Sequence, residues 1–347
     1  MWLENPIFRE DMECIAGVDF VPWEKLRGKT LFITGATGLI GFNLISALVY
    51  MNLKRDIPLK IFALVRDETK ARARFAEILA EGAPLQFVLG DLEHIPVVDE
   101  KVDYIIHGGS PTASRYFAEH PVETIRMNLL GATALLEMAK EKQVESFLFL
   151  SSMEVYGSLH REEKVDEDHE SFVNTMNPRS SYPEAKRMIE AMCASYAAQY
   201  NVPTKVIRLT QTFGAGVRKE DNRVYAQFMR SAMAGEDIVL LTQGGTRRSY
   251  LYTADAVTAI LTVLLKGKNG EAYNAANEDT YCSIKEMAEM VASMKEVNVV
   301  VKASKEIDKL YPAELFMNLS SQRLRKLKWE SKLSLQEMFM KMMGTCD

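Results

Sequence analysis

From residue 29 to residue 209, the chain alternates short runs of β-branched and aromatic residues with longer stretches whose apolar residues recur at helical spacing. The short runs are continuously apolar, as in strands that helices cover on both faces. They span 29–34, 60–65, 85–89, 104–108, 146–152 and 204–209, and the longer stretches span about 40–52, 67–81, 122–142 and 181–200. Each longer stretch is long enough to cross from one parallel strand to the next. The alternation therefore predicts an α/β fold with a doubly wound parallel sheet.

After about Leu209 the alternation gives way to glycine-containing loops and shorter elements. Helices are expected near 223–234, 254–266 and 283–295, and the segment YNAAN at 273–277 is expected to return to the first sheet as a strand end. We therefore divide the chain into an amphipathic lead-in at 1–27 that packs on the body, a sheet domain at 28–209, and a smaller, interleaved C-terminal lobe at 210–347 that binds the substrate.

The composition is that of a globular protein, and it argues against several classes of function. The net charge of −5 and the lack of a Lys/Arg block disfavour nucleic acid as a partner. Cys14, Cys193, Cys282 and Cys346 lie far apart without a CxxC pair, which predicts neither a metal site nor a disulfide framework. The N-terminus does not resemble a signal peptide, and the longest apolar-dominated run, at 256–265, is about half of the ~20 residues that a membrane span needs. We expect a cytoplasmic protein without a membrane segment.

The junction of the first predicted strand with the first predicted helix is rich in glycine. In TLFITGATGLIGFNLISALV, Gly35, Gly38 and Gly41 stand at GxxGxxG spacing. The first glycine permits the tight turn, the second lets backbone N–H groups approach a pyrophosphate at the helix N-terminus, and the third packs the helix against the strand. A glycine-rich turn without a ligand is the alternative, but this position in the fold favours a dinucleotide site.

The residues after the second and third strands bear on which dinucleotide binds. Arg66 stands where many dinucleotide sites have an acid that binds the adenosine ribose hydroxyls, and Asp67 comes one residue later. A guanidinium prefers a phosphate, so Arg66 favours NADP unless it is a solvated surface arginine, whereas Asp67 leaves NAD possible. Asp91, in GDL after the third strand, either accepts from the adenine amino group or is an ordinary turn acid.

A tyrosine and a lysine stand four residues apart in SSYPEAKRMIEAM. Helical spacing places Tyr182 and Lys186 on one face of the helix predicted at 181–200. The ammonium is expected to lower the pKa of the phenol, so that Tyr182 takes a hydroxyl proton while a hydride leaves for a nicotinamide. Ser152, at the end of the fifth strand, is placed to orient the same oxygen. A YxxxK pair often occurs by chance, but its place after the glycine loop and after SSMEVYG favours the catalytic interpretation.

Together these residues resemble the extended short-chain dehydrogenase/reductase superfamily, specifically its NAD(P)-dependent nucleotide-sugar epimerases, dehydratases and decarboxylases. The resemblance runs from about Gly28 to about Trp329 through GATGLIG, GDL, IIHGGS, MNLLGATALLEMAK, LFLSSMEVYG, SSYPEAKR, RLTQTFG, RRSYLYTADA and YNAAN. It implies a Rossmann fold, an NAD(P)-binding domain at 28–209, and a catalytic triad of Ser152, Tyr182 and Lys186. It also assigns the cofactor site to Gly35, Thr37, Gly38, Leu39, Ile40, Gly41, Asp91, Leu92, Tyr182 and Lys186.

Within this superfamily, DNRVYAQF followed by TRRSYLYTADAV is most similar to UDP-glucuronate decarboxylases (UDP-xylose synthases), and dTDP-glucose 4,6-dehydratases come second. By this similarity Glu154 is catalytic and lies beside C5 and C6 of the sugar, Arg248 contacts the substrate diphosphate, and the residues that bind the substrate are Ser152, Glu154, Gln211, Arg223 and Arg248. In the dehydratases, an aspartic acid before that glutamate protonates the departing 6-hydroxyl. Here Met153 takes its place, and a thioether donates no proton. Gln211 replaces the asparagine that usually contacts the substrate phosphates.

The resemblance implies an enzyme in which bound NAD(P) transiently oxidises the C4 hydroxyl of a nucleoside-diphosphate sugar. A C4 ketone acidifies H5 and makes a C5 carboxylate a β-keto acid, so decarboxylation and epimerisation at C4 or C5 share one intermediate. A nucleotide-sugar 4,6-dehydratase or 4-epimerase is the alternative. A non-catalytic dinucleotide-binding sensor or scaffold is the alternative of another class, against which the complete set of Ser152, Tyr182 and Lys186 argues. A homodimer is expected because the helices at 122–142 and 181–200 carry apolar residues beyond one face, similar to the superfamily's intersubunit four-helix bundle.

Overall fold

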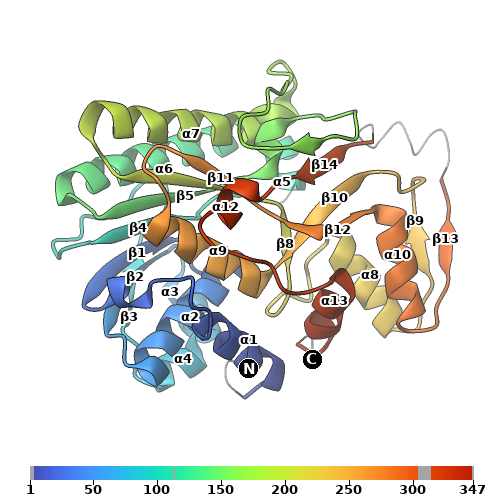
Figure 1. The fold of residues 1–347 in the computed structure, drawn as a ribbon, viewed down its shortest axis with the longest axis horizontal. Helices are drawn as coiled ribbons and strands as arrows, with labels where there is room; N and C mark the ends of the chain where they lie inside the picture. Colours follow the sequence, from blue (N-terminus) through green and yellow to red (C-terminus); the bar gives the residue numbers. More distant parts are fainter. Residues whose placement is uncertain (1–3, 112–113, 304–313, 346–347) are drawn as a thin grey trace.

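A seven-stranded parallel sheet forms the centre of the larger region of the molecule (Figure 1). The computed structural model describes residues 4–111, 114–303 and 314–345. Within them the strands follow the order β11-β7-β5-β4-β1-β2-β3, and each neighbouring pair is parallel. The strands are β1 (Lys29–Thr34), β2 (Leu59–Val65), β3 (Leu85–Leu89), β4 (Tyr104–His107), β5 (Ser146–Ser152), β7 (Thr204–Leu209) and β11 (Ala272–Ala275). The chain order reverses between β1 and β4, which confirms the predicted doubly wound Rossmann sheet.

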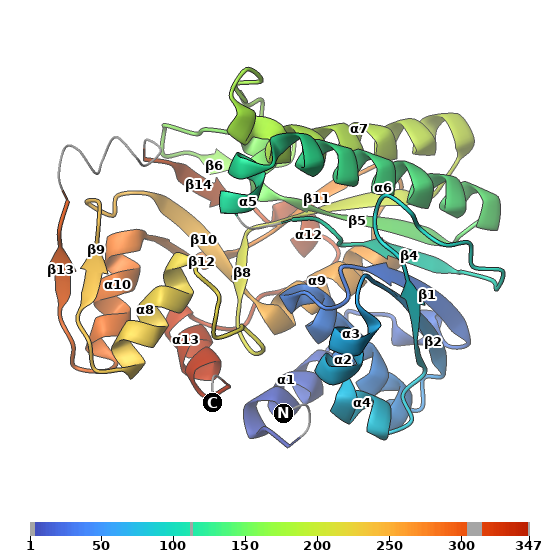
Figure 2. The same ribbon diagram turned by 180° about the vertical axis from the view of Figure 1, so that it is seen from behind.

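Helices cover both faces of this sheet (Figures 1 and 2). One layer holds α5 (Ser114–Glu119), α6 (Pro121–Lys142) and α7 (Ser181–Tyr200); the other holds α1 (Pro6–Ala16), α2 (Leu39–Arg55), α3 (Glu68–Arg74), α4 (Ala76–Ala80) and α9 (Thr253–Lys266). Alternate side chains of β5 show the division. Phe149 packs in the cluster that contains Ile189 of α7, whereas Leu150 packs in the cluster that contains α2 and α9. Because both faces are buried, the strands read as continuous apolar runs.

The helix predicted at 67–81 is interrupted at Phe75. This residue has φ −102° and ψ 15°, so it ends α3 and begins α4. Its ring is fully buried between Phe42 and Phe87, with ring centroids 5.2 and 5.9 Å away. Helical periodicity predicted one continuous helix because periodicity does not take tertiary contacts into account. Here the packing of the Phe75 ring accompanies a departure from helical backbone geometry.

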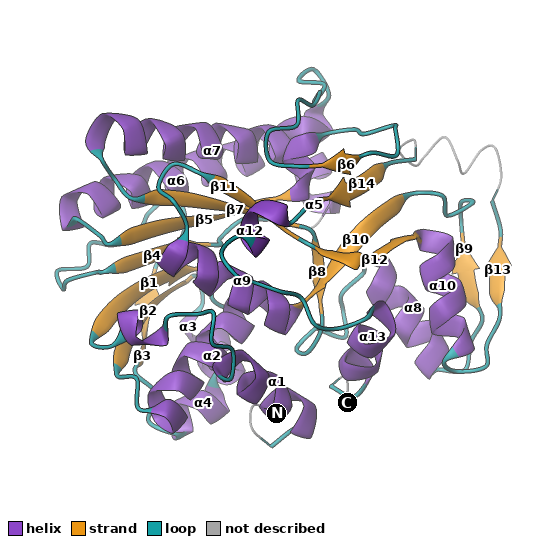
Figure 3. Cartoon of the chain, in the orientation of Figure 1, coloured by secondary structure: helices purple, strands orange, loops and turns teal. Residues whose placement is uncertain are grey.

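The second region consists of short strands and helices (Figure 3). A sheet in the order β12-β10-β14-β6, with β8 beside β10, comprises β6 (Lys164–Val165), β8 (Gln211–Phe213), β10 (Arg247–Tyr252), β12 (Asn277–Ser283) and β14 (Phe316–Leu319). A second, two-stranded sheet pairs β9 (Ile238–Leu240) with β13 (Val299–Val301), and the helices are α8 (Val224–Met233), α10 (Ile284–Ser293), α12 (Gln322–Arg325) and α13 (Leu335–Met343). The C-terminal part of the chain is interleaved with the Rossmann region, because α9 and β11 belong to the latter.

The N-terminal lead-in forms α1, which packs on α2 and α9. Asn5 caps this helix by accepting from the amides of Ile7 and Phe8, and Phe8, Met12 and Ile15 are buried beneath it. The η1 segment (Trp23–Leu26) then leads into β1.

No helix in the described ranges is both long and apolar enough to cross a membrane. Cys14, Cys193 and Cys282 are free thiols, and Cys346 lies outside the described residues.

Candidate active site

The turns that follow β1 and β4 touch each other at the point where the strand order reverses. Gly35 has φ +75°, and a Cβ built on it would lie 2.6 Å from the carbonyl oxygen of Gly108. A Cβ on Gly41 would lie 2.2 Å from the carbonyl oxygen of Gly35, so the first turn of α2 rests directly on the loop. Neither position has room for a side chain. Parallel sheets bind ligands at this reversal point, beyond the carboxyl ends of the strands.

The N-terminus of α2 presents free amides at the same place. Gly38 is the N-cap residue, and no side chain caps the helix. The first amides of a helix have no partner within the helix and attract anions, so an uncapped start beside a glycine loop fits the pyrophosphate of a dinucleotide. Leu39 and Ile40 form the first helical positions there, and both are half-buried.

A loop from the second region lies over this glycine loop. The Arg218 guanidinium donates to the carbonyl oxygen of Thr37 at 3.0 Å, and Asn43 Nδ2 donates to the carbonyl oxygen of Ala215 at 3.0 Å. Arg74 lies beside Arg218, and burial together with the Arg218 charge lowers the pKa of Arg74 to about 10. The two arginines were not predicted, because α3 and the loop are far apart in sequence.

The side chains expected to bind the adenosine end of the cofactor differ in the contacts that they make within the protein. Arg66 is exposed directly after β2. Asp67 caps α3 by accepting from the Lys70 amide at 3.0 Å. Asp91 Oδ1 accepts from the amides of Glu93 and His94, so this carboxylate holds its own turn. Leu92 packs against α6, where a Cβ on Gly131 would lie 3.0 Å from the Leu92 Cβ.

Tyr182 and Lys186 lie on the face of α7 that is turned toward the end of β5. The Lys186 ammonium donates to the carbonyl oxygen of Leu150 at 2.9 Å and lies 5.6 Å from the centroid of the Tyr182 ring. Lys186 is 2% exposed, and burial lowers its pKa to about 7. Tyr182 stacks on Phe117 with ring centroids 4.9 Å apart. Tyr182 and Lys186 therefore share one face of α7, as their spacing predicted.

The expected pKa shift of Tyr182 is wrong in direction. Burial raises the pKa of the phenol, the Glu154 charge raises it further, and a hydrogen bond with Ser152 opposes both. Burial outweighs the effect expected of Lys186, whose ammonium donates to the carbonyl oxygen of Leu150. Residue spacing shows that the two side chains share a face, but it does not show how deeply both are desolvated.

Glu154 lies next to this pair, on the 3₁₀ helix η2 (Met153–Tyr156) that follows β5. Burial raises the pKa of its carboxyl group, and the charges of Arg179 and Arg248 lower it. Arg248 comes from β10, and its buried Nε has no hydrogen-bond partner among the described residues. Arg179, on the 3₁₀ helix η3 (Pro178–Ser180), lies over the Phe117 ring. Arg179 was not predicted as a residue of the site, although its position three residues before Tyr182 could have indicated that it lies there.

The remaining predicted residues occupy the second region or the core. Gln211 begins β8 beside β10, opposite Tyr250. Arg223 precedes α8, and its Nε donates to Asp221 at 2.9 and 3.1 Å, so its predicted contact with substrate stays a prediction. Met153 is 6% exposed, and its sulfur accepts from the Thr210 hydroxyl.

Residues 31–276 match the sequence profile of the NAD dependent epimerase/dehydratase family. The chain is 28% identical over 268 residues to UDP-glucuronic acid decarboxylase 1 of Danio rerio, which covers 77% of this chain and 60% of that protein. It is 26% identical over 328 residues to human dTDP-D-glucose 4,6-dehydratase, covering 91% and 90%. The fold is similar to the structure of UDP-glucuronic acid 4-epimerase from Bacillus cereus in complex with UDP-glucuronic acid and NAD, with a TM-score of 0.74, 17% identity, and coverage of 91% and 98%.

Proposed function

Because the chain belongs to the NAD dependent epimerase/dehydratase family, we propose that it uses tightly bound NAD(P) to oxidise transiently the C4 hydroxyl of a nucleoside-diphosphate sugar, and that decarboxylation or epimerisation follows. One observation carries this proposal. Ser152 bonds to Tyr182, Lys186 lies on the same helix face, and the Glu154 charge acts on the Tyr182 phenol. This cluster follows β5, one strand away from β4, whose turn touches the glycine loop.

The side chains divide the oxidation step among them. Tyr182 accepts the proton of the C4 hydroxyl while Ser152 hydrogen-bonds to the same oxygen. The Lys186 ammonium stabilises the phenolate electrostatically. A nicotinamide cofactor, held by the glycine loop together with Tyr182 and Lys186, would supply the hydride acceptor for the oxidation of C4 and the hydride donor for the return step. Since burial raises the pKa of Tyr182, the phenolate needs a positive charge nearby, and Lys186 is the cation on the same helix face.

Decarboxylation is the branch that the charges around Glu154 favour. Arg179 and Arg248 both act on this one carboxylate, so a uronate carboxylate at C5 would supply a second negative charge to balance the two guanidinium groups. In a 4-ketouronate the C5–C6 bond breaks and CO₂ leaves. The electron pair of that bond forms an enolate across C4 and C5, and C5 then takes a proton from water. Loss of water from C6 instead needs an acid beside the 6-hydroxyl, and Met153 supplies none.

The cofactor preference is for NADP. Arg66 is exposed at the end of β2, and Arg74 and Arg218 place two further cations beside the glycine loop. A 2′-phosphate pairs well with guanidinium groups. Asp67, which would favour NAD, already caps α3. NAD is the alternative, and the B. cereus epimerase contains it.

The assembly is proposed to be a homodimer formed through α6 and α7. Val122 and Ile125 on α6, and Met188 on α7, are 69%, 41% and 53% exposed, although each is apolar. Apolar side chains that share neighbouring helices favour burial against a second copy of the same surface. The mass in solution, measured by light scattering at micromolar concentration, tests this assembly, and a monomer would contradict it.

Incubation of the purified protein with UDP-glucuronate and with dTDP-glucose tests the activity. Loss of CO₂ from UDP-glucuronate, detected by mass spectrometry, would support decarboxylation. A change of configuration at constant mass would support epimerisation. Efficient loss of water from dTDP-glucose would contradict the argument from Met153. A protein that binds NAD(P) and leaves both sugars and a wider panel of nucleotide sugars unchanged would be the non-catalytic sensor or scaffold.

A further inference from the structure

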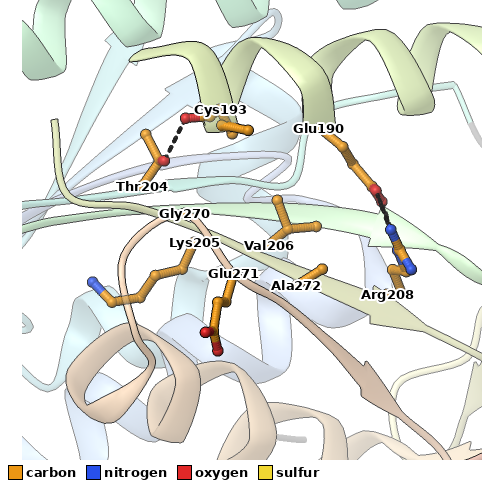
Figure 4. Close-up of a pocket in the computed structure, with 10 residues that line it drawn as sticks. Glu190, Cys193, Thr204, Lys205, Val206, Arg208, Gly270, Glu271 and Ala272 are labelled. Atoms are coloured by element: carbon orange, nitrogen blue, oxygen red, sulfur yellow. Dashed lines mark hydrogen bonds and ion pairs between the residues drawn. The ribbon is translucent and has the colours of Figure 1, made fainter. Parts of the chain in front are cut away.

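Glu190 continues the stripe of Tyr182 and Lys186 along α7, one helical turn further on. Its carboxylate accepts from Ser151 Oγ at 2.5 Å, and Arg208 Nη2 donates to it at 2.7 Å. Figure 4 shows this ion pair spanning from α7 to the sheet. Ser151 on β5 and Arg208 on β7 are register partners, so both reach Glu190 from one row of the sheet. The side chains of Arg208 and Glu190 are 15% and 12% exposed, which makes this a largely buried pair.

Arg208 also connects this row to the segment that carries Glu154. Its Nη1 donates to the Tyr156 hydroxyl at 2.8 Å, and that hydroxyl donates to Asn274 Oδ1 at 2.8 Å. Tyr156 belongs to η2, the same 3₁₀ helix as Glu154. The Glu190–Arg208 pair therefore links the helix of Tyr182 and Lys186 with the helix of Glu154.

The charges around Lys186 come from several elements. On α7 they are Tyr182 and Glu190; from η2, Glu154 acts on Tyr182; and from β7, Arg208 lies behind Glu190. From β4, His107 is neutral, because burial and the Lys186 charge lower its pKa to about 3. Burial lowers the pKa of Lys186, and Glu190 is the carboxylate that opposes this.

We propose that Glu190 is a positioning residue of the active site, which fixes α7 against the end of β5 and supplies the negative charge that faces the Lys186 ammonium. It acts through Lys186, and through Arg208 and Tyr156 on the placement of Glu154. This inference rests on the proposed function, because it assigns the charge of Lys186 a part in the oxidation of the sugar.

The test is Glu190→Gln, which removes the charge but keeps an oxygen that can accept from Ser151 and Arg208. It also leaves the Arg208 guanidinium without its carboxylate partner. The loss of activity at alkaline pH, measured with UDP-glucuronate, should therefore begin about one pH unit lower than in the wild type. Cavities of about 150 and 390 Å³ border the Glu190–Arg208 pair, so water can reach the freed guanidinium and the variant should fold.

Two variants separate the charge from the hydrogen bond. Glu184→Gln makes the same change on the same helix, where Glu184 pairs with Arg187 at 3.7 Å, and should leave the pH profile unchanged. Ser151→Ala removes one hydrogen bond to Glu190 and should lower turnover without moving the alkaline limb. If Glu190→Gln does not fold, the double variant Glu190→Gln with Arg208→Gln removes both buried charges and is measured in the same way.

A second readout does not depend on the substrate. The ultraviolet absorbance of tyrosinate, taken as the difference from Tyr182→Phe in NAD(P)-loaded protein, reports the ionisation of Tyr182. In Glu190→Gln this titration should differ from that of the wild type, because the variant changes the charge beside Lys186, which lies 5.6 Å from the centroid of the Tyr182 ring. A folded Glu190→Gln protein with an unchanged alkaline limb and unchanged tyrosinate titration would overturn the proposal. A wild type without turnover of UDP-glucuronate would instead contradict the proposed function, and the tyrosinate titration would still decide the part of Glu190.

Discussion

The turns after β1 and β5 end two strands of the same sheet, but the backbone shapes the first turn and side chains shape the second. At the turn after β1 the backbone does so: Gly35 and Gly41 exclude side chains, and the start of α2 has no side-chain cap. At the turn after β5 side chains do so: Ser152, Glu154 and the facing Lys186 are held by hydrogen bonds and buried charges. The first turn should therefore respond to added volume, and the second to lost charge or a lost hydroxyl.

Tyr182→Phe should have the largest effect, since it removes the hydroxyl that takes the C4 proton. Turnover of the sugar nucleotide should fall about 10³-fold, within the range of general acid–base catalysis. Bound NAD(P), measured after gel filtration, should remain. Tyr200→Phe, at an exposed position near the end of α7, is the matched control and should be neutral. Undiminished turnover in Tyr182→Phe would dismiss the mechanism.

Gly38→Val should act on the other turn. The backbone at Gly38, with φ −72° and ψ 174°, accepts any residue, and a Cβ would lie 3.2 Å from the Gly35 carbonyl oxygen. The protein should fold, while the side chain blocks the free amides and lowers NAD(P) affinity about 100-fold, equivalent to ~2.7 kcal/mol. Calorimetric titration measures this affinity. Wild-type affinity in a folded variant would show that the site lies elsewhere.

Arg66→Ala should have a smaller, selective effect. The exposed guanidinium should contribute about tenfold to NADP affinity and little to NAD affinity, because solvent weakens an exposed charge pair. Arg72→Ala, on the neighbouring α3 where Arg72 pairs with Glu68, is the control. Mass spectrometry of the released cofactor gives the native preference, and NAD alone, unaffected by Arg66→Ala, would overturn the preference for NADP.

Asp255→Asn should have the smallest effect and should leave the chemistry unchanged. Asp255 lies in the first turn of α9, and burial raises its pKa from 3.8 to about 7. Its contribution to stability is therefore fully present below pH 3.8 and is lost as the pH rises to about 7, where a buried anion forms. Above that pH the amide should raise the free energy of unfolding by about 1–2 kcal/mol. Thermal unfolding at several pH values measures the gain, and a gain that is equal in acid would contradict the assignment.

The two turns also differ in how far the sequence predicts them. The strands that carry them match the predicted runs, with β1 at 29–34 and β5 at 146–152, because a strand covered on both faces is continuously apolar. The glycine spacing is a local property, and so is the helix face shared by Tyr182 and Lys186. The sequence therefore predicted both turns and the residues within them.

Long-range contacts were not predicted. Arg218 and Arg74 lie beside each other at the glycine loop, although their segments are distant in sequence. Glu190 pairs with Arg208 only when β7 lies beside β5. The pKa of Tyr182 was predicted in the wrong direction, because burial is a property of the packed site and not of a four-residue spacing. Charged side chains read as surface residues until their tertiary partners are known.

The buried Asp11 of α1 has a mechanical consequence. Tyr252 of β10 donates to Asp11 at 2.6 Å, and Lys341 of α13 donates to it at 2.9 Å. The N-terminal helix is therefore hydrogen-bonded to two elements of the second region. The same helix packs on α2, which begins at the glycine loop. Hinge motion between the two regions must therefore stretch or break these bonds. Arg248 is on the same strand as Tyr252, so the same bonds restrain its movement relative to the Rossmann region.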